Sequence, residues 1–125
     1  MTKLILMTGS FLGALAVLLG AIGSHFFEDH LIYLDRLETY KKAVQYQFYH
    51  VFLILIIGLL SNYASRPIIN YAFYSAIIGL FLFSGSLYML CFTNNSAWGI
   101  VTPFGGLSLI CSWLFLCFSV KKVNL

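Results

Sequence analysis

Residues 28–42 read EDHLIYLDRLETYKK, and this short charged connector decides how the rest of the chain is organised. The connector holds all four acidic residues of the sequence and three of its seven lysines and arginines. Outward from it lie four long segments without Lys, Arg, Asp or Glu, at residues 4–23, 43–61, 68–92 and 101–120. About 20 residues at a helical rise of about 1.5 Å cross a hydrocarbon core of about 30 Å. Each segment is therefore long enough to span a bilayer.

The composition points to the same class of protein. The chain of 125 residues is 61% hydrophobic and 9% charged, whereas a soluble domain carries about 25% charged residues. In lipid, such long apolar runs satisfy their backbone groups only as helices. We expect a single all-α domain over residues 1–125, a four-transmembrane-helix bundle with spans near 4–23, 43–61, 68–92 and 102–120. The few basic residues form no cluster, which argues against a nucleic-acid partner.

Local signals refine the helix boundaries. Asp35 followed by Glu38 fits a capping box, and no Pro or Gly occurs from there until Gly58, so one helix is expected over 37–60. Thr102 and Pro103 have the pattern of an N-cap and N1 pair that starts the fourth helix. Before the second helix we expect a short amphipathic interfacial segment between the first two spans. Its apolar side is formed by Leu31, Leu34 and Leu37.

The first span ends in Ala21-Ile22-Gly23, which resembles a signal-peptide cleavage site, but the apolar run is long for a signal peptide. We expect it to be retained. The cysteines lie inside or at the end of apolar segments, and an odd number there is no disulfide framework. They are expected to be small packing residues: Cys91, Cys111 and Cys117.

Membrane orientation follows from the lysines and arginines of the short loops, which favour the cytoplasm. With four spans, both termini and the loop around Arg66 share one side. That side carries Lys3, Arg66, Lys121 and Lys122, against Arg36, Lys41 and Lys42 on the side of the acidic residues. The excess, four against three, predicts cytoplasmic termini in a bacterial cytoplasmic membrane.

Small residues recur at three- and four-residue steps along the first span, as is typical of closely packed membrane helices. The positions expected to pack helices are Gly9, Gly13, Gly20, Gly79, Gly105 and Gly106. This pattern fits packing within the chain, or an interface with a membrane-protein partner or a second copy. The interface hypothesis predicts that Gly13→Leu abolishes association.

Polar residues within the spans are the candidates for a site, because polar groups are costly in lipid. They cluster in the halves of the spans nearest the connector, which suggests an outward-facing site near the headgroups. They are His25, Tyr46, Gln47, His50, Ser84, Ser86, Tyr88 and Thr102. They fit either hydrogen bonds between helices or a site for a lipid, quinone, haem or metal.

For metal or haem ligation, hydrolysis and proton-coupled transport, the sequence lacks part of the residue pattern that each requires. His25 and His50 could together ligate a haem or metal, with Glu28, Asp29 and His30 as further ligands, but two histidines are not a specific signal. Ser84 or Ser86 beside His50 lacks a recognisable orienting group or oxyanion hole, which disfavours a hydrolase. A proton-coupled transporter would need a carboxylate within the membrane. No cofactor and no catalytic residue are assigned.

Four ordered motifs resemble one known family. They are GAIGSH at residues 20–25, AVQYQFYH at 43–50, LFSGSLY at 82–88 and TPFGG at 102–106. The chain is similar over its whole length to the small bacterial inner-membrane proteins grouped as UPF-0382, or domain of unknown function 423 (YgdD-type). Small membrane proteins of metazoan mitochondria look related. Two departures from the family pattern are conservative: Ser24 stands where Ala is usual, and Tyr40 where Trp is expected.

The resemblance implies a four-span fold and a plasma-membrane location, and it supplies no activity. From the sequence we expect a non-enzymatic accessory or scaffold subunit that associates with another membrane protein or with itself. The alternative is a binding protein for a lipid, quinone, haem or metal at the outward-facing polar residues.

Overall fold

The computed structural model describes residues 1–120, and all regular structure in that range is helical. The elements are α1 (Thr2–His25), α2 (Glu28–Tyr33), α3 (Leu37–Leu60), α4 (Arg66–Thr93), the 3₁₀ helix η1 (Ser96–Ile100) and α5 (Thr102–Val120). Four helical stretches, with η1 and α5 forming the last, are long and apolar enough to cross a membrane. The predicted all-α, four-span fold is therefore confirmed.

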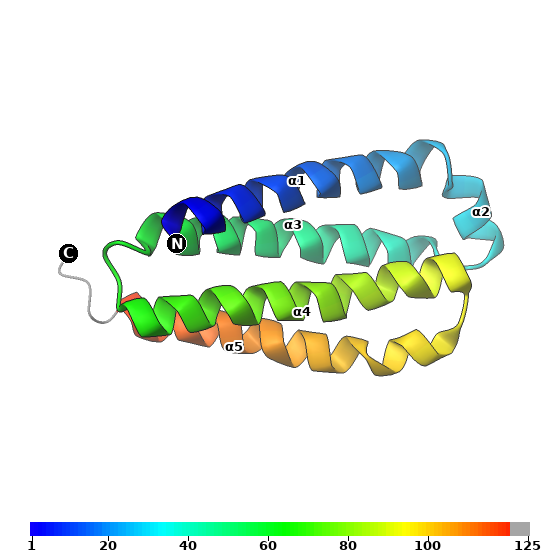
Figure 1. Cartoon of the computed structure of the whole chain (residues 1–125). Coiled ribbons are helices and arrows are strands. Elements are labelled where there is room, and N and C mark those ends of the chain that lie inside the picture. The colour runs from blue at the N-terminus through cyan, green and yellow to red at the C-terminus, as the bar shows by residue number, and fades with distance from the viewer. Residues whose placement is uncertain (121–125) are drawn as a thin grey trace.

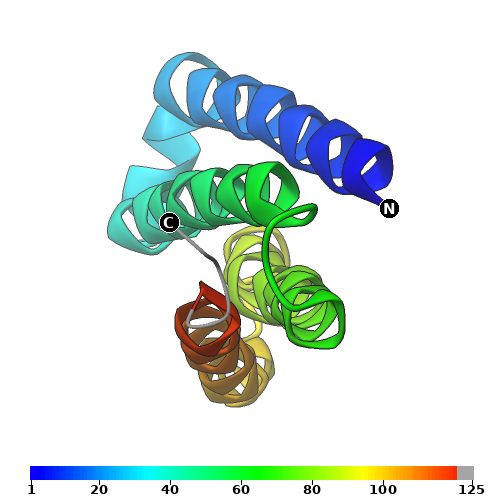
Figure 2. The same cartoon turned by 90° about the vertical axis from the view of Figure 1, so that its left-hand side faces the viewer.

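The four long helices lie in an open row in the order α1, α3, α4 and α5 (Figures 1 and 2). Helix α1 packs mainly on α3, α3 on α4, and α4 most extensively on α5. In the most apolar window of each span, 44% and 39% of residues are buried in α3 and α4, against 22% in α1 and 17% in the η1–α5 stretch. The outer helices therefore leave most of their surface to lipid or to other proteins.

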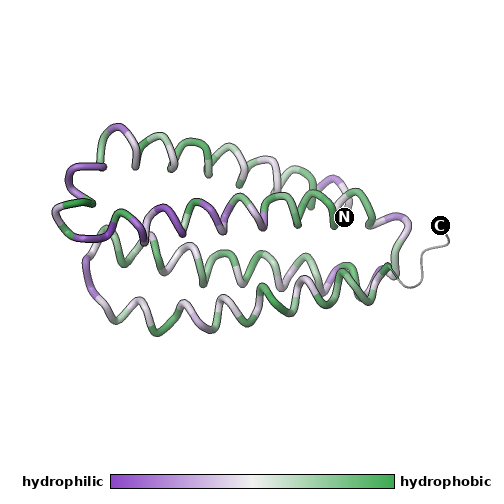
Figure 3. Tube along the Cα trace, turned by 180° about the vertical axis from the view of Figure 1, so that it is seen from behind, coloured by the Kyte–Doolittle hydropathy of each residue, from purple (hydrophilic) through white to green (hydrophobic). Residues whose placement is uncertain are grey.

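The two ends of the row differ in polarity. We call the end with α2 and η1 the connector end, and the end with Thr2, the α3–α4 turn and Val120 the terminal end. Hydrophilic residues gather at the connector end and along the adjoining half of α3 (Figure 3). Lys121 and Lys122, which contributed to the predicted orientation, lie outside the described residues.

Glycines allow close packing at both outer contacts of the row. A Cβ added at Gly9 would lie 2.9 Å from a methyl carbon of Leu55, and one at Gly79 would lie 2.8 Å from the backbone nitrogen of Leu109. At Gly105 an added Cβ would overlap the backbone of Phe83. Because lipid provides little hydrophobic drive for association, this close approach matters for van der Waals attraction between the helices.

The start of α3 corrects one prediction. The helix begins at Leu37 as expected, but Arg36 is its N-cap and no side chain caps it. Asp35 instead has a φ of 57°, a left-handed conformation, directly after α2. The amide of Arg36 donates to the Leu31 carbonyl at 2.8 Å, and that of Asp35 to the Ile32 carbonyl at 3.1 Å. These two bonds form a Schellman motif. The predicted capping box is wrong because Asp35 ends α2.

The predicted interfacial segment is present as α2, but its apolar side faces partly inward. Leu31 is 1% exposed and packs with Tyr40 and Cys91 in a small cluster at the connector end. Ile32 and Tyr33 are instead the exposed apolar residues of α2. Helix α5 begins at Thr102 as predicted. The Thr102 hydroxyl is hydrogen-bonded to the Ser86 hydroxyl, so this side chain forms a contact between α5 and α4.

Candidate functional site

Gln47 lies buried in α3 and joins three helices. Its side-chain amide donates to the carbonyl of Leu12 in α1 at 2.9 Å. Its Oε1 accepts a hydrogen bond of 2.7 Å from the Tyr88 hydroxyl of α4. A buried amide in lipid is costly unless paired, and here its carbonyl oxygen and its amide nitrogen both have partners in the chain.

His50 has both ring nitrogens engaged, which fixes its tautomer. The indole N–H of Trp113 donates to Nε2 at 3.1 Å, and Nδ1 lies 2.8 Å from the Tyr46 carbonyl. Because an indole N–H can only donate, Nε2 is the acceptor and Nδ1 carries the proton. The imidazole is therefore neutral. A metal at Nε2 would have to displace Trp113.

The hydroxyl candidates also bond between helices. Ser84 donates to the Ala43 carbonyl at 2.8 Å, joining α4 to α3. The hydroxyls of Ser86 and Thr102 bond to each other, joining α4 to α5. Tyr46 is half-exposed and rests its ring 4.7 Å from that of Phe83. Ser84 therefore has no base beside it, and the disfavoured hydrolase gains no support.

The candidates do not form one outward-facing site. Gln47 and His50 fall near the middle of α3, whose 24 residues span about 36 Å, whereas we expected them near the headgroups. His25 is exposed at the connector end of α1. Gly13, which packs against Val51, marks the level of His50, and His25 lies about 18 Å further along α1. A ligand shared by the two histidines is therefore not supported.

The connector acids do not complete a metal site either. Within residues 1–120, no group of three or more His, Cys, Asp or Glu side chains is placed to hold a metal ion. Of the cysteines, Cys91 is buried and its thiol lies 3.7 Å from the Arg36 carbonyl. Cys111 and Cys117 are exposed, so they face the surroundings of α5 and not the core as expected.

The small residues of α1 face α3 of the same chain. An added Cβ would meet Val51 at 3.2 Å from Gly13, and Val44 at 3.5 Å from Gly20. Gly106 has a looser surrounding than Gly105, with the Phe83 ring 3.6 Å away. The small residues that suggested a partner interface therefore pack against α3 of the same chain.

An apolar groove of about 120 Å³ remains open between α1 and α4, above the Gln47–Tyr88 hydrogen bond. Its lining is Leu12, Leu15, Leu19, Gln47, Leu80, Phe81, Ser84, Gly85 and Tyr88. Gly85 is the open position, since a Cβ added there would meet nothing within 4 Å. Sequence reasoning missed Gly85 because an open glycine and a packed glycine look alike in a sequence.

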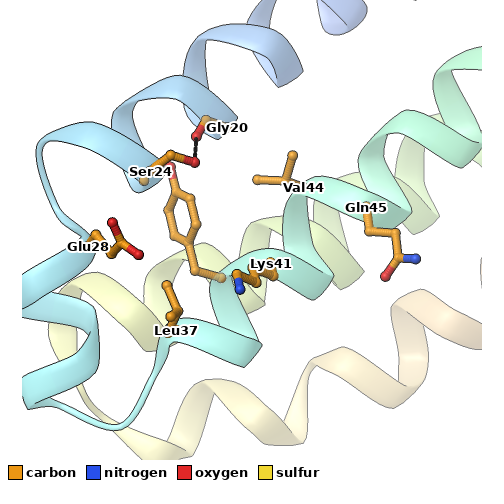
Figure 4. A pocket seen from close by; sticks show the side chains of 9 residues that line it. Gly20, Ser24, Glu28, Leu37, Lys41, Val44 and Gln45 are labelled. Carbon is orange, nitrogen blue, oxygen red and sulfur yellow. Dashed lines mark hydrogen bonds between the residues drawn. The ribbon is translucent and has the colours of Figure 1, made fainter.

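A second, half-open cavity of about 230 Å³ lies between α1 and α3 at the connector end. Figure 4 shows Gly20 and Ser24 on α1, Glu28 on α2 closing one end, and Lys41, Val44 and Gln45 along α3. Gly23, Leu37 and Tyr40 complete its lining. We call it the connector cavity. The sequence indicates these residues only as parts of a family motif or of the connector. The shape of the cavity depends on the hydrogen bond that the Tyr40 hydroxyl donates to the Leu19 carbonyl.

Both spaces are smaller than the about 300–1,000 Å³ of typical ligand pockets. A haem macrocycle is too large to enter either space without displacing helices.

Comparison with known proteins identifies what the chain is similar to. Residues 19–106 match the family model "Protein of unknown function (DUF423)". The chain is 38% identical to UPF0382 membrane protein SH2409 of Staphylococcus haemolyticus, over 96% of this chain and 97% of that protein. It is 34% identical to UPF0382 membrane protein YwdK of Bacillus subtilis, over 96% and 98% respectively. No solved structure matches the chain.

Proposed function

The chain belongs to the UPF0382 (DUF423) family of membrane proteins, and we propose that it is a non-enzymatic accessory or scaffold protein that docks an apolar transmembrane helix in the groove between α1 and α4. The docked helix belongs to another membrane protein or to a second copy of this chain.

The observation that carries this proposal is the open groove with Gly85 on its floor. Association in lipid depends on close backbone approach at small residues, and Gly85 leaves room for it. The neighbouring Phe81 is 63% exposed and offers a large contact surface beside the glycine. These two features together favour a helix that packs its side chains into the space over Gly85.

The polar residues support a structural role for the rest of the row. The buried candidates Gln47, His50, Ser84 and Ser86 have hydrogen-bond partners inside the chain. In residues 1–120, no buried side-chain nitrogen or oxygen lacks a partner. Groups held in this way are poorly placed to act on a substrate, which favours binding over catalysis.

We propose the contact with a partner at Gly85, whereas the sequence suggested Gly13. Gly13 packs against Val51, so Gly13→Leu would disturb the α1–α3 contact and could not report on association alone. A Cβ added at Gly85 meets nothing within 4 Å, so Gly85→Leu is the substitution chosen to fill the groove. Gly99→Leu is the matched control, because a Cβ at Gly99 also meets nothing within 4 Å and Gly99 lies in η1, away from the groove.

The experiment places a photoactivatable phenylalanine analogue at Phe81 or, as control, at Phe104. Phe104 has a similar exposure, 65%, but lies on α5 outside the groove. Irradiation of intact membranes should give a protein adduct from position 81 and not from 104, and Gly85→Leu should remove it while Gly99→Leu does not. An adduct of twice the chain mass identifies a second copy. Adducts with lipid alone at both positions would contradict the proposal.

We also propose that both termini face the cytoplasm of a bacterial cell, in the cytoplasmic membrane. The count of lysines and arginines supports this orientation, because Lys3, Arg66, Lys121 and Lys122 belong to the predicted cytoplasmic side, against Arg36, Lys41 and Lys42 on the other.

A further inference from the structure

We propose that the connector cavity binds the headgroup of a phospholipid with a primary ammonium group, the phosphate lying at Lys41 and the ammonium at Glu28. This inference does not depend on the proposed docking groove, because the two spaces share no lining residue.

The position of the cavity suits a lipid headgroup. It lies between the connector ends of two spanning helices, next to α2, which is the interfacial element of the fold. Ser24, Lys41 and Gln45 of its lining are exposed, so acyl chains attached to a bound headgroup can follow the outer faces of α1 and α3 into the bilayer. Its volume of about 230 Å³ is too small for a typical whole ligand and suits a headgroup.

The walls of the cavity leave two opposite charges available. Ser24 is bonded to the Gly20 carbonyl, Gln45 to the Tyr49 hydroxyl, and Tyr40 to the Leu19 carbonyl. Within residues 1–120, the Glu28 side chain has neither an ion pair nor a hydrogen bond, whereas the Lys41 ammonium lies 3.7 Å from a carboxylate oxygen of Glu38. The Lys41 side chain is 62% exposed, so this pair is weak and Lys41 can turn to a phosphate.

The charge balance selects the class of headgroup. Counting Asp, Glu, Lys and Arg, the connector carries four acidic residues against Arg36, Lys41 and Lys42, which leaves a formal net charge of −1. A headgroup with net negative charge would be repelled, whereas a zwitterion matches the one carboxylate and the one ammonium of the cavity. A primary ammonium can also donate hydrogen bonds to the Glu28 carboxylate, which a trimethylammonium cannot.

The cavity wall on the α1 side is made of small residues that let a headgroup approach the backbone. A Cβ at Gly20 would be in ordinary contact with Val44, 3.5 Å away, so an alanine fits there and a larger side chain would enter the cavity. Gly20→Leu therefore blocks the cavity by volume, whereas Glu28→Gln and Lys41→Gln remove only its charges.

The test titrates the full-length protein, purified in mild detergent, with phosphatidylethanolamine, phosphatidylcholine or phosphatidylglycerol and counts retained lipids by native mass spectrometry. We expect one phosphatidylethanolamine to be retained in preference to the other two. Glu28→Gln and Lys41→Gln should each weaken this binding about threefold to fivefold, as for a partly exposed ion pair. Gly20→Leu should abolish the preference, with helix content by circular dichroism unchanged.

Asp29→Asn is the matched control, since it removes the same charge from the neighbouring residue of α2, outside the cavity. It should leave phosphatidylethanolamine binding unchanged. Equal losses in Glu28→Gln and Asp29→Asn would overturn the site, because only the general charge of the connector would then matter. Retention of phosphatidylcholine or phosphatidylglycerol as tightly as phosphatidylethanolamine would also overturn it.

Discussion

The indole of Trp113 on α5 donates a hydrogen bond to Nε2 of His50 on α3, across a distance of 3.1 Å. Helices α3 and α5 otherwise have little contact, because α4 lies between them for most of their length. This one bond therefore ties the edge helix α5 to the second helix of the row, and it sets the histidine tautomer at the same time.

We expect the His50–Trp113 pair to stabilise the position of α5. His50→Phe and Trp113→Phe should each lower the free energy of unfolding. A double-mutant cycle should give a coupling energy between about 0.6 and 1.7 kcal/mol, the average and the maximum measured for hydrogen bonds between membrane helices. The measurement is reversible unfolding in mixed micelles. Trp98→Phe is the control, because Trp98 lies in η1 and should show no coupling to His50. A coupling of zero would mean that the bond contributes nothing to stability.

Gln47 offers a second test, with Gln45 as its control. Gln47→Leu removes the bonds to Leu12 and Tyr88 and leaves the Tyr88 hydroxyl without its partner, so we expect a loss of about 1–3 kcal/mol in stability. Gln45 is exposed on the same helix and bonds only within α3, to Tyr49. Gln45→Leu should change stability by less than about 0.5 kcal/mol. Equal effects of the two substitutions would contradict the structural role of Gln47.

The sequence alone predicted the number, class and approximate limits of the helices, because the span length and the absence of charge depend on local composition. It also predicted the start of α3 at Leu37. The reason given for that start was wrong, since Asp35 is the left-handed residue that closes α2. Both roles suit an aspartate, and the choice depends on the fold of the preceding turn.

The partners of the polar residues could not be predicted from the sequence. That Gln47, His50 and Tyr88 are unusual in a span was evident, but Trp113 gave no comparable signal, because tryptophan is common in membrane helices. The open order of the row depends on which helix faces match. This order of the helices brings His50 into contact with α5 and leaves His25 at the connector end, away from His50.

Gly105 and Gly106 are adjacent glycines for which we predict opposite outcomes. Gly105→Ala would place its Cβ on the backbone of Phe83 and force α4 and α5 apart, at a cost of about 1–3 kcal/mol. Gly106→Ala would leave 3.6 Å to the Phe83 ring and should stabilise the helix by about 0.5–1 kcal/mol. Thermal unfolding of the two variants in one detergent compares them directly. Equal melting temperatures would show that α4 and α5 are not in this close contact.

The orientation of the row in the membrane can be tested by cysteine labelling. In a chain with Cys91, Cys111 and Cys117 replaced by Ser, single cysteines at Asp29 and Asn62 lie at exposed positions at opposite ends of the row. If both termini are cytoplasmic, a membrane-impermeant maleimide added to intact bacterial cells should label position 29 and not 62. After lysis both should react, which controls for accessibility. Labelling of position 62 alone in intact cells would reverse the orientation, since Asn62 shares the terminal end with Thr2, to which it is hydrogen-bonded.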